Sequence, residues 1–256
     1  MKQRADLLTV TQGLAPSREA ARRRIMAGEV FCTVGGRTER VAKPGQLLPA
    51  AAVLSATAPP RFVSRGGDKL MSALEGITAR GLELPLAGAV ALDAGASTGG
   101  FTDCLLQHGA ARVYAVDVGR GQLHVRLRQD PRVVSLEGVN LRHAPADLIP
   151  EPVHVVVADC SFISLRHILP PCITWLAPGG YALALVKPQF EVGPRWVGKG
   201  GVVRDEAARL AAVEGIRRFA EEELGLTPLA TIPSAVLGPK GNQEYFLFLR
   251  WEKSSS

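Results

Sequence analysis

The stretch Val90-Ala91-Leu92-Asp93-Ala94-Gly95-Ala96-Ser97-Thr98-Gly99-Gly100-Phe101 decides the fold. It places an apolar strand-like segment, a loop of small residues and a helix start in succession, which is where doubly wound sheets bind nucleotide-like ligands. Dinucleotide-binding loops follow the pattern G-x-G-x-x-G, whose middle glycine lets the backbone approach a pyrophosphate. Ser97 occupies that middle position and would crowd a pyrophosphate. The loop therefore disfavours a dinucleotide.

The spacing Asp93-x-Gly95-x-Ser97-x-Gly99 resembles the first motif of S-adenosylmethionine-dependent methyltransferases. Asp117 ends the next strand-like segment, where its carboxylate can accept both ribose hydroxyl groups of an adenosyl ligand. A tight strand-to-helix turn with a capping aspartate is the structural alternative. We expect S-adenosyl-L-methionine as the cofactor. Its predicted binding residues are Asp93, Gly95, Ser97, Thr98, Gly99, Gly100, Asp117, Val118, Asn140 and Asp159.

Strand-like and helix-like segments alternate from about residue 82 onward. The predicted strands span residues 89–93, 112–117, 132–136, 153–158 and 180–186, and the predicted helices span 99–108, 120–129, 164–175 and 205–224. Such alternation predicts an α/β fold with a mostly parallel sheet covered on both faces. Two late strands, 228–234 and 244–250, have no crossover helix between them and predict an antiparallel edge hairpin.

The helix predicted at 205–224 has the clearest apolar periodicity. Leu210, Val213, Ile216, Phe219 (or Ala220) and Leu224 fall on one face at helical spacing, so we expect this face to be buried against the sheet.

The net charge of +6 is distributed unevenly along the chain. Residues 1–70 carry 12 lysines and arginines against 5 acidic residues, whereas residues 71–256 carry 18 against 19. The whole basic excess therefore lies in the first quarter of the chain. This asymmetry suggests a surface for a polyanion attached to a neutral body, with a solubilising surface as the alternative.

The first 60 residues predict two short helices followed by small strands. Ser17 stands at the N-cap position of a helix at 17–27, and residues 30–34 with the Gly35-Gly36 turn predict a hairpin. This order resembles the S4 RNA-binding domain through Arg4 and Asp6, the run Ser17-Arg18-Glu19-Ala20-Ala21, and Ile25-Met26-Ala27-Gly28. The resemblance implies RNA contacts by arginines, because their planar fork suits phosphate. Our candidates are Arg4, Arg18, Arg22 and Arg65.

Four ionisable residues stand out by their context: Lys69, Asp159, Lys187 and Glu244. Asp159 and Lys187 end apolar strand-like segments, at the rim where open α/β sheets build their sites. Taken singly, each could be an exposed rim charge. Together with the loop at residues 93–99 that resembles the methyl-donor motif (the methyl-donor loop), their positions predict that they are catalytic.

Longer motifs extend the resemblance over essentially the whole chain. Val63-Ser64-Arg65-Gly66-Gly67, residues 92–102, Asp117-Val118-Gly119, residues 158–164, residues 186–191 and residues 241–246 are similar to the TlyA-type ribosomal RNA 2′-O-methyltransferases, whose members often carry the name haemolysin. That family joins an S4 domain to an FtsJ/RrmJ-like methyltransferase domain. The resemblance implies an S4-like domain at 1–60, a linker and leading helix at 61–81, and a Rossmann-like class I methyltransferase domain at 82–252.

The resemblance also implies a catalytic tetrad and a substrate. The family's Lys-Asp-Lys-Glu tetrad falls on Lys69, Asp159, Lys187 and Glu244. The implied reaction is methyl transfer to a ribose 2′-hydroxyl of ribosomal RNA, at cytidine in 16S RNA, 23S RNA or both. Asn140 departs from the wider FtsJ pattern, which often has an adenine-contacting aspartate there.

A ribose hydroxyl is a poor nucleophile because its proton is hard to remove. Lys187, positioned by Asp159, is expected to accept or steer that proton and to stabilise the developing alkoxide. Lys69 and Glu244 are expected to orient the hydroxyl and the central lysine. Phe162 is a candidate for stacking on the target base, with a core aromatic as the alternative.

Composition excludes several classes of protein. The four cysteines form no C-x-x-C pair, so we expect reduced thiols in a cytoplasmic protein and no metal site. No apolar run approaches the roughly 18 residues of a membrane span. We also expect no membrane association and a monomer, and the family resemblance implies ribosomal RNA or ribosomal subunits as partners.

Three other functions are considered. The chain could be a catalytically inactive RNA-binding or ribosome-assembly protein, although an inactive body has no need of four polar rim residues. It could be a membrane-active haemolysin, although no strongly apolar amphipathic helix is evident. A base-amine methyltransferase often carries Asn/Asp-Pro-Pro-aromatic, and Asp159-Cys160-Ser161-Phe162 lacks both prolines.

Overall fold

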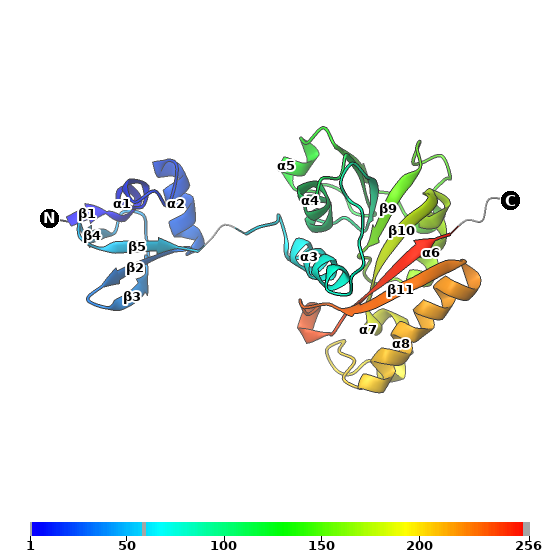
Figure 1. The fold of residues 1–256 in the computed structure, drawn as a ribbon. Helices are drawn as coiled ribbons and strands as arrows, with labels where there is room; N and C mark the ends of the chain where they lie inside the picture. The colour runs from blue at the N-terminus through cyan, green and yellow to red at the C-terminus, as the bar shows by residue number, and fades with distance from the viewer. Residues whose placement is uncertain (1, 58–59, 253–256) are drawn as a thin grey trace. The chain divides into compact units, whose positions relative to one another are not determined.

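The computed structural model describes residues 2–57 and 60–252, and the chain divides into two compact units at residues 1–60 and 61–256 (Figure 1). The first unit contains two short helices and two small sheets. Its elements are β1 (Lys2–Arg4), α1 (Ala5–Thr11), α2 (Arg18–Ala27), β2 (Val30–Val34), β3 (Arg37–Arg40), β4 (Leu47–Pro49) and β5 (Val53–Ala56). The strands form an antiparallel sheet in the order β3-β2-β5 and a pair β1-β4.

The local signals read from the sequence of this unit are confirmed. The Ser17 hydroxyl accepts a hydrogen bond from the amide of Ala20 and caps α2, which ends at Gly28 in the left-handed conformation. The β2-β3 hairpin turns at Gly35 and Gly36. The core of the unit consists of small and branched side chains from both helices and from β2, β4 and β5, with Leu8, Ile25 and Val30 fully or almost fully buried.

A buried carboxylate fixes two arginines of this unit. The Asp6 side chain is inaccessible to solvent and accepts hydrogen bonds from Arg4 Nε at 3.1 Å, Arg4 Nη2 at 3.0 Å and Arg18 Nε at 3.0 Å. Arg4 and Arg18 remain about half exposed, so each still offers N–H groups to solvent. The two guanidinium groups lower the pKa of Asp6 to about 2.

Replacing Asp6→Asn is expected to destabilise the first unit at neutral pH by about 1–2 kcal/mol, a range that allows for screening of the half-exposed arginines. Because the pKa of Asp6 is lowered in the folded state to about 2, its stabilisation is complete well above the ordinary value of 3.8 and is lost as pH falls toward 2. Hydrogen exchange of the α1 and α2 amides at about pH 7 and about pH 3 measures the effect, and the difference between wild type and variant should shrink by roughly half at the lower pH. The control Glu19→Gln breaks an exposed pair with Arg23 and should change stability by less than about 0.5 kcal/mol. An equal effect of both variants would contradict the prediction.

The second unit is built on a seven-stranded sheet in the order β11-β12-β10-β9-β6-β7-β8. The strands are β6 (Val90–Ala94), β7 (Arg112–Asp117), β8 (Val133–Glu137), β9 (Val153–Ala158), β10 (Leu176–Val186), β11 (Leu226–Pro233) and β12 (Tyr245–Trp251). β6 to β10 are mutually parallel, whereas β12 runs antiparallel between β10 and β11. The predicted mostly parallel sheet with an antiparallel edge hairpin is confirmed.

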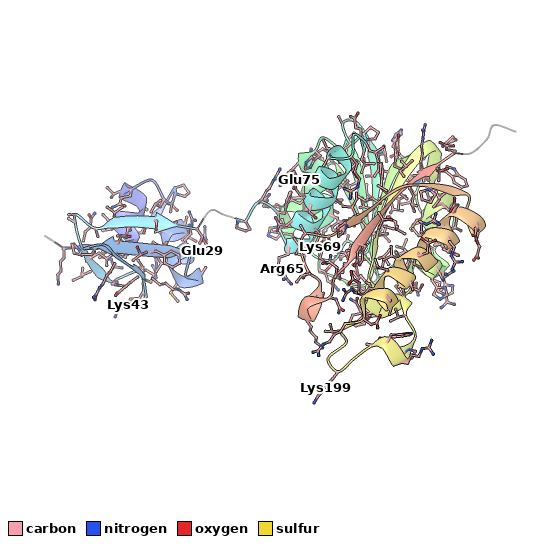
Figure 2. The ribbon with its side chains drawn as sticks, turned by 60° about the horizontal axis from the view of Figure 1, so that its bottom comes forward. Glu29, Lys43, Arg65, Lys69, Glu75 and Lys199 are labelled. Carbon is pink, nitrogen blue, oxygen red and sulfur yellow. The ribbon has the colours of Figure 1, made fainter. Side chains whose placement is uncertain are left out.

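Alternate residues of the central strands point into two separate cores. Ala91, Val113 and Val155 pack on one face of the sheet with α3 (Arg65–Thr78), α4 (Gly100–Gln107) and the short α5 (Val125–Arg128). Leu92 and Val156 pack on the other face with α6 (Leu165–Thr174) and α8 (Glu206–Arg218). Figure 2 shows Arg65 and Lys69 in the first turns of α3. Both faces of the sheet are thus covered, and the central strands are buried along most of their length.

Two helix predictions need correction. The helix predicted at 120–129 is reduced to α5, because the Glu137 carboxylate accepts hydrogen bonds from the amides of Gly121, Gln122 and Leu123 and holds them as a loop.

The helix predicted at 205–224 also differs from expectation. It is α-helical only to Arg218 and continues as a π-helix at Phe219–Glu223 (η3). Leu210 is 49% exposed, whereas Val213 and Ile216 are buried. The wider π turn changes the helical register, so that Phe219 and Ala220 are both buried.

Candidate active site

The strands β6, β7, β9 and β10 all end at the same edge of the sheet, and the loops that follow them form the site. The loop after β6 depends on two glycines in the left-handed region. A Cβ atom at Gly95 (φ 89°) would lie 3.1 Å from both Asp159 O and Cys160 Sγ, and one at Gly99 (φ 95°) would lie 2.3 Å from Leu127 Cδ1. Only glycine fits at these positions without displacing its neighbours.

Asp117 at the end of β7 is held by two backbone amides. Its Oδ2 atom accepts a hydrogen bond from the amide of Ser97 at 2.7 Å, and its Oδ1 atom accepts one from the amide of Gly119 at 2.7 Å. Ser97 adopts a left-handed conformation (φ 49°) to make this contact. The carboxylate is therefore oriented in advance and keeps lone pairs for a ligand.

Asp93 lies beneath the loop and not at its surface. It is fully buried beneath the loop, where Thr102 Oγ1 donates to its Oδ2 atom at 2.6 Å and its Oδ1 atom has no partner among the described residues. Burial raises the pKa of Asp93 to about 7, with the Thr102 hydrogen bond acting in the opposite direction. Asp93 and Gly99 line neither of the cavities at this edge. Asp93 and Gly99 therefore stabilise the loop without lining either cavity.

Two cavities meet at the loop. The first, of about 520 Å³, is lined by Asp117, Val118, Asn140, Leu141 and Ile163 among others. The second, of about 310 Å³, is lined by loop residues together with Arg65, Lys69 and Lys187. Gly95, Ser97, Asp159 and Ser161 belong to both linings, so the cavities share a wall.

The two cavities differ in charge. Among the described residues no lysine or arginine lines the first cavity, whose carboxylates are those of Asp117 and Asp159. The lining of the second cavity contains three cations, Arg65, Lys69 and Lys187, against the single carboxylate of Asp159. The first cavity therefore favours a neutral or cationic ligand, and the second an anionic one.

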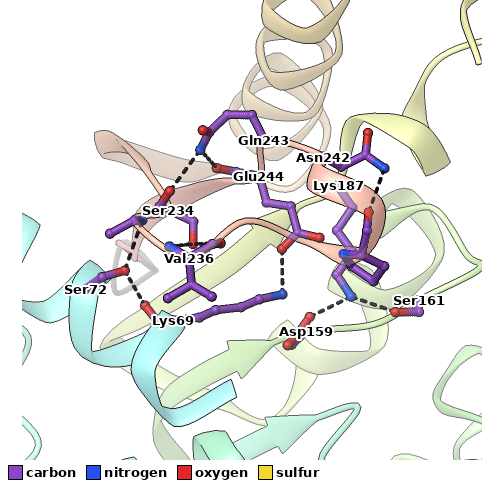
Figure 3. A network of polar contacts seen from close by, with 12 residues as sticks. Lys69, Ser72, Asp159, Ser161, Lys187, Ser234, Val236, Asn242, Gln243 and Glu244 are labelled. Atoms are coloured by element: carbon purple, nitrogen blue, oxygen red, sulfur yellow. Dashed lines mark hydrogen bonds and ion pairs between the residues drawn. The ribbon is translucent and has the colours of Figure 1, made fainter. Parts of the chain in front are cut away.

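The four residues singled out as catalytic come together beside the second cavity (Figure 3). Lys69 Nζ donates to Glu244 Oε2 at 2.6 Å, and Lys187 Nζ lies 2.7 Å from Asp159 Oδ1. Lys187 Nζ also donates to Ser161 Oγ at 2.6 Å. The approach to Asp159 Oδ1 lacks hydrogen-bond direction, so that contact is an ion pair. Both lysines and Glu244 are largely or fully buried, which restricts their motion.

The turn before β12 fixes the position of the Glu244 side chain. The contacts that do so were not predicted from the sequence. Glu244 Oε1 is buried without a hydrogen-bond partner among the described residues, and it lies against the backbone of Gly238. A Cβ atom at Gly238 would approach Glu244 Oε1 to 2.2 Å. Gln243 Nε2 donates to Ser234 O at 2.9 Å and ties the turn to the end of β11.

Replacing Gly238→Ala is expected to lower kcat at least tenfold, because the added methyl group displaces the Glu244 carboxylate and with it Lys69. The affinity for the methyl donor should stay within about threefold, because Gly238 lines neither cavity. Single-turnover methyl transfer and calorimetric titration separate these two quantities. Gly215→Ala is the matched control, since its nearest neighbour would be Arg166 Nη2 at an ordinary 3.7 Å. Unchanged kcat in Gly238→Ala would show that the carboxylate position is not critical.

Ser161 and Asn242 are two further polar residues that were not assigned a role from the sequence. Ser161 holds the Lys187 ammonium, and Asn242 is buried between two loops. Asn242 Oδ1 accepts from the amide of Val203 at 3.1 Å, and its Nδ2 donates to Gly201 O at 2.8 Å. In the sequence, the only indication that Ser161 and Asn242 belong to the site was their position two residues from Asp159 and Glu244, respectively.

An exposed aromatic residue lies at the rim of the first cavity. Phe162 is 90% exposed and adopts a left-handed conformation (φ 64°), which is costly for a bulky side chain. Its ring lies 5.2 Å from that of Phe190 at an interplanar angle of 48°. The alternative of a core aromatic is wrong, because so little of the ring is covered.

The arginines predicted to contact RNA lie in both units. Arg4, Arg18 and Arg22 belong to the first unit, and Arg65 begins α3 and lines the second cavity. Arg24, in contrast, is used structurally, since it pairs with Glu29 and donates to the carbonyl groups of Leu14 and Thr57.

Two other kinds of feature are absent from the described residues. No group of three or more His, Cys, Asp or Glu side chains is arranged to hold a metal ion. Within residues 2–57 and 60–252, no helix is both long and apolar enough to cross a membrane.

Comparison with known proteins identifies the family. Residues 62–251 match the model of the FtsJ-like methyltransferases. The chain belongs to this family. The matched region contains the methyl-donor loop and all four residues beside the second cavity, and the sheet described above is the methyltransferase sheet.

Relatives of this FtsJ-like methyltransferase extend over nearly its full length. It is 44% identical over 254 residues to "Putative rRNA methyltransferase YqxC" of Bacillus subtilis (strain 168), covering 98% of this chain and 86% of the relative. It is also 44% identical to "16S/23S rRNA (cytidine-2'-O)-methyltransferase TlyA" of Mycobacterium tuberculosis (strain ATCC 25618 / H37Rv), covering 96% and 89%. A solved structure, "Putative hemolysin from Streptococcus thermophilus", is 41% identical with a TM-score of 0.72 and covers 99% of this chain and 90% of that one.

Proposed function

We propose that this FtsJ-like methyltransferase transfers a methyl group from S-adenosyl-L-methionine to a ribose 2′-hydroxyl of ribosomal RNA, at cytidine in 16S RNA, 23S RNA or both. The observation that carries the reaction is the pairing of Lys187 with Asp159 and of Lys69 with Glu244 beside a cavity that adjoins the cofactor loop. The assignment of ribosomal RNA as substrate and of cytidine as the methylated nucleotide rests on the name of the M. tuberculosis relative.

The first cavity fits S-adenosyl-L-methionine. Its acidic lining suits a cationic sulfonium, and the oriented Asp117 carboxylate can accept the ribose hydroxyl groups. Val118, Leu141 and Ile163 supply apolar contacts for the adenine ring. Asn140 Oδ1 already accepts from the amide of Arg142 at 3.1 Å, which leaves its Nδ2 group to donate to a ring nitrogen.

When bound, the cofactor supplies an activated methyl group for displacement by an oxygen nucleophile. The residues of the second cavity prepare that oxygen. Lys187 Nζ, once it has lost one proton, accepts the 2′-hydroxyl proton, and the ammonium group so formed stabilises negative charge on the oxygen, while Asp159 and Ser161 fix its position. Lys69, held by Glu244, orients the hydroxyl. Arg65 at the same cavity is suited to a neighbouring phosphate.

The thiol nearest the site argues against a covalent mechanism on the base. Cys160 follows Asp159, and burial raises the pKa of its thiol to about 12 despite the nearby Lys187 ammonium. A thiol that stays protonated at neutral pH is a poor nucleophile. This favours direct transfer to oxygen over attack of a cysteine on a pyrimidine ring.

Two surfaces are proposed to hold the RNA. Residues 1–60 are proposed as an S4-like RNA-binding domain, with Arg4 and Arg18 presented by Asp6 and with Arg22 on the same helix as Arg18. Phe162 is proposed to stack on a base taken out of its helix, because an exposed aromatic ring at the cavity rim provides such a platform. We also infer a cytoplasmic, monomeric protein.

The test is methyl transfer from labelled S-adenosyl-L-methionine to small subunits, large subunits and free ribosomal RNA that lack the modification. The label is then mapped to base or ribose by alkaline hydrolysis, since a 2′-O-methyl group blocks alkaline cleavage of the adjoining phosphodiester. Label on a ribose supports the proposal. Label on a base, or no label on any of these substrates by a protein that binds the cofactor, would overturn it.

A further inference from the structure

A basic loop lies between α7 (Pro188–Glu191) and α8, and the mechanism above does not use it. Residues 194–204 contain Arg195, Lys199 and Arg204 and no aspartate or glutamate. All three cations are exposed, and none belongs to a salt bridge among the described residues. Arg217 on the neighbouring helix, in contrast, pairs with both Glu214 and Glu221. The charges of this loop are therefore free for a ligand.

The loop is folded into a defined hairpin. The amide of Gly198 donates to Val202 O at 3.0 Å, and the amide of Gly201 donates to Gly198 O at 3.0 Å. Lys199 lies near the tip, where Figure 2 shows its side chain projecting away from the unit. Gly200 and Gly201 have φ of 89° and 79° and allow the tight turn.

The base of the hairpin is fixed next to the catalytic residues. Asn242, two residues before Glu244, is 3% exposed and binds both the carbonyl group of Gly201 and the amide of Val203. Arg209 Nη1 adds hydrogen bonds to Val203 O and Arg204 O. A mobile surface loop would not need a buried amide side chain for its attachment.

A groove beside this loop adjoins the second cavity. It has a volume of about 490 Å³ and is lined by Val202, Arg204, Arg209 and Leu237 among others. Leu237 also lines the second cavity, which contains Lys69 and Lys187. A chain that places one ribose in the second cavity can therefore continue over Leu237 into the groove.

We propose that residues 194–204 form an arm that binds phosphate groups of the RNA strand adjoining the methylated nucleotide. This inference rests on the proposed function, because that function places RNA in the second cavity. Arg195 and Trp196 add a contact of a second kind, since the guanidinium group lies 5.2 Å from the centre of a 41% exposed indole ring. Cations interleaved with an exposed aromatic ring suit a single RNA strand, whose phosphates and bases they bind in turn.

The experiment compares two triple variants of the full-length chain. Arg195→Ala/Lys199→Ala/Arg204→Ala removes the charges of the arm. Arg80→Ala/Arg218→Ala/Arg250→Ala removes the same charge from exposed positions near the far ends of α3, α8 and β12, elements that begin at the catalytic edge. Each protein is titrated with the ribosomal RNA substrate over a series of salt concentrations, without cofactor, and methyl transfer is measured in parallel.

The arm variant is expected to bind RNA at least tenfold more weakly at about 0.1 M salt, with the slope of log K against log [salt] reduced by about two to three. Its KM for RNA should rise by a similar factor while kcat changes less than about threefold. The far-edge variant should behave as wild type. Arg195→Lys/Arg204→Lys keeps the point charges and should keep the salt slope, which a merely structural role of these side chains does not predict.

Equal RNA affinity of the arm and far-edge variants would overturn the inference while leaving methyl transfer by the wild type, and hence the proposed function, intact. Failure of the wild type to methylate RNA would overturn the proposed function, and the binding titrations would still test the arm. Failure of the wild type to bind RNA at all would overturn both.

Discussion

Replacing Lys187→Ala is expected to lower kcat for methyl transfer by at least about a thousandfold while leaving cofactor affinity within about threefold. Lys187 Nζ lies 2.7 Å from Asp159 Oδ1 and 2.6 Å from Ser161 Oγ, so its position is fixed by two partners. It lines the second cavity and not the first. The substitution should therefore impair the activation of the acceptor oxygen and leave cofactor binding almost unchanged.

The measurement combines single-turnover transfer with calorimetric titration of the cofactor. Lys187→Arg is the informative companion, because a guanidinium group keeps the positive charge but cannot accept a proton. Recovery of substantial activity by arginine would assign electrostatic stabilisation to Lys187, and its absence would assign proton transfer. Ser161→Ala should cost less, about tenfold, because Asp159 still holds the ammonium group.

Two results would contradict this assignment. Methyl transfer by Lys187→Ala within about tenfold of wild type would show that another group prepares the oxygen. Loss of cofactor binding in parallel with activity would show that the substitution disturbs the shared wall at Asp159 instead.

Features of the sequence that are local along the chain predicted much of this structure. The strand ends at Asp117, Asp159 and Lys187 follow apolar runs, and parallel strands bring such ends to one edge of the sheet. The replacement of the middle glycine by Ser97 pointed away from a dinucleotide, and the cavity beside it has no cationic lining among the described residues. The strands β6 and β7 are buried along nearly their whole length because their residues contact two helical layers in alternation.

Features that depend on contacts between distant segments were not predictable from patterns. Lys69 and Glu244 are separated by 175 positions, and their pairing was implied only by family resemblance. The close approach of Gly238 to the Glu244 carboxylate requires the folded turn. The helix α5 is shorter than predicted because the distant Glu137 carboxylate binds the amides of Gly121, Gln122 and Leu123. Leu210 fitted the apolar periodicity and is nevertheless half-exposed, because periodicity does not fix the edge of a buried face.

Replacing Asp117→Ala is expected to weaken cofactor binding by about 10- to 100-fold, the range for losing hydrogen bonds to a charged acceptor. The Asp117 carboxylate lines the first cavity and is held by the amides of Ser97 and Gly119 at 2.7 Å each. Because part of the loss could come from loosening of the loop, the direct contribution needs a separate measurement.

A thermodynamic cycle separates the two contributions. S-Adenosylhomocysteine and its 2′,3′-dideoxyribose analogue are titrated into wild type and Asp117→Ala. If Asp117 accepts the ribose hydroxyl groups, the substitution weakens binding of the normal ligand by at least tenfold more than binding of the dideoxy analogue. A loosened loop would weaken both ligands equally, since the same amides of Ser97 and Gly119 lose their acceptor in either complex. Equal losses would therefore assign Asp117 to support of the loop, and the predicted ribose contact would be wrong.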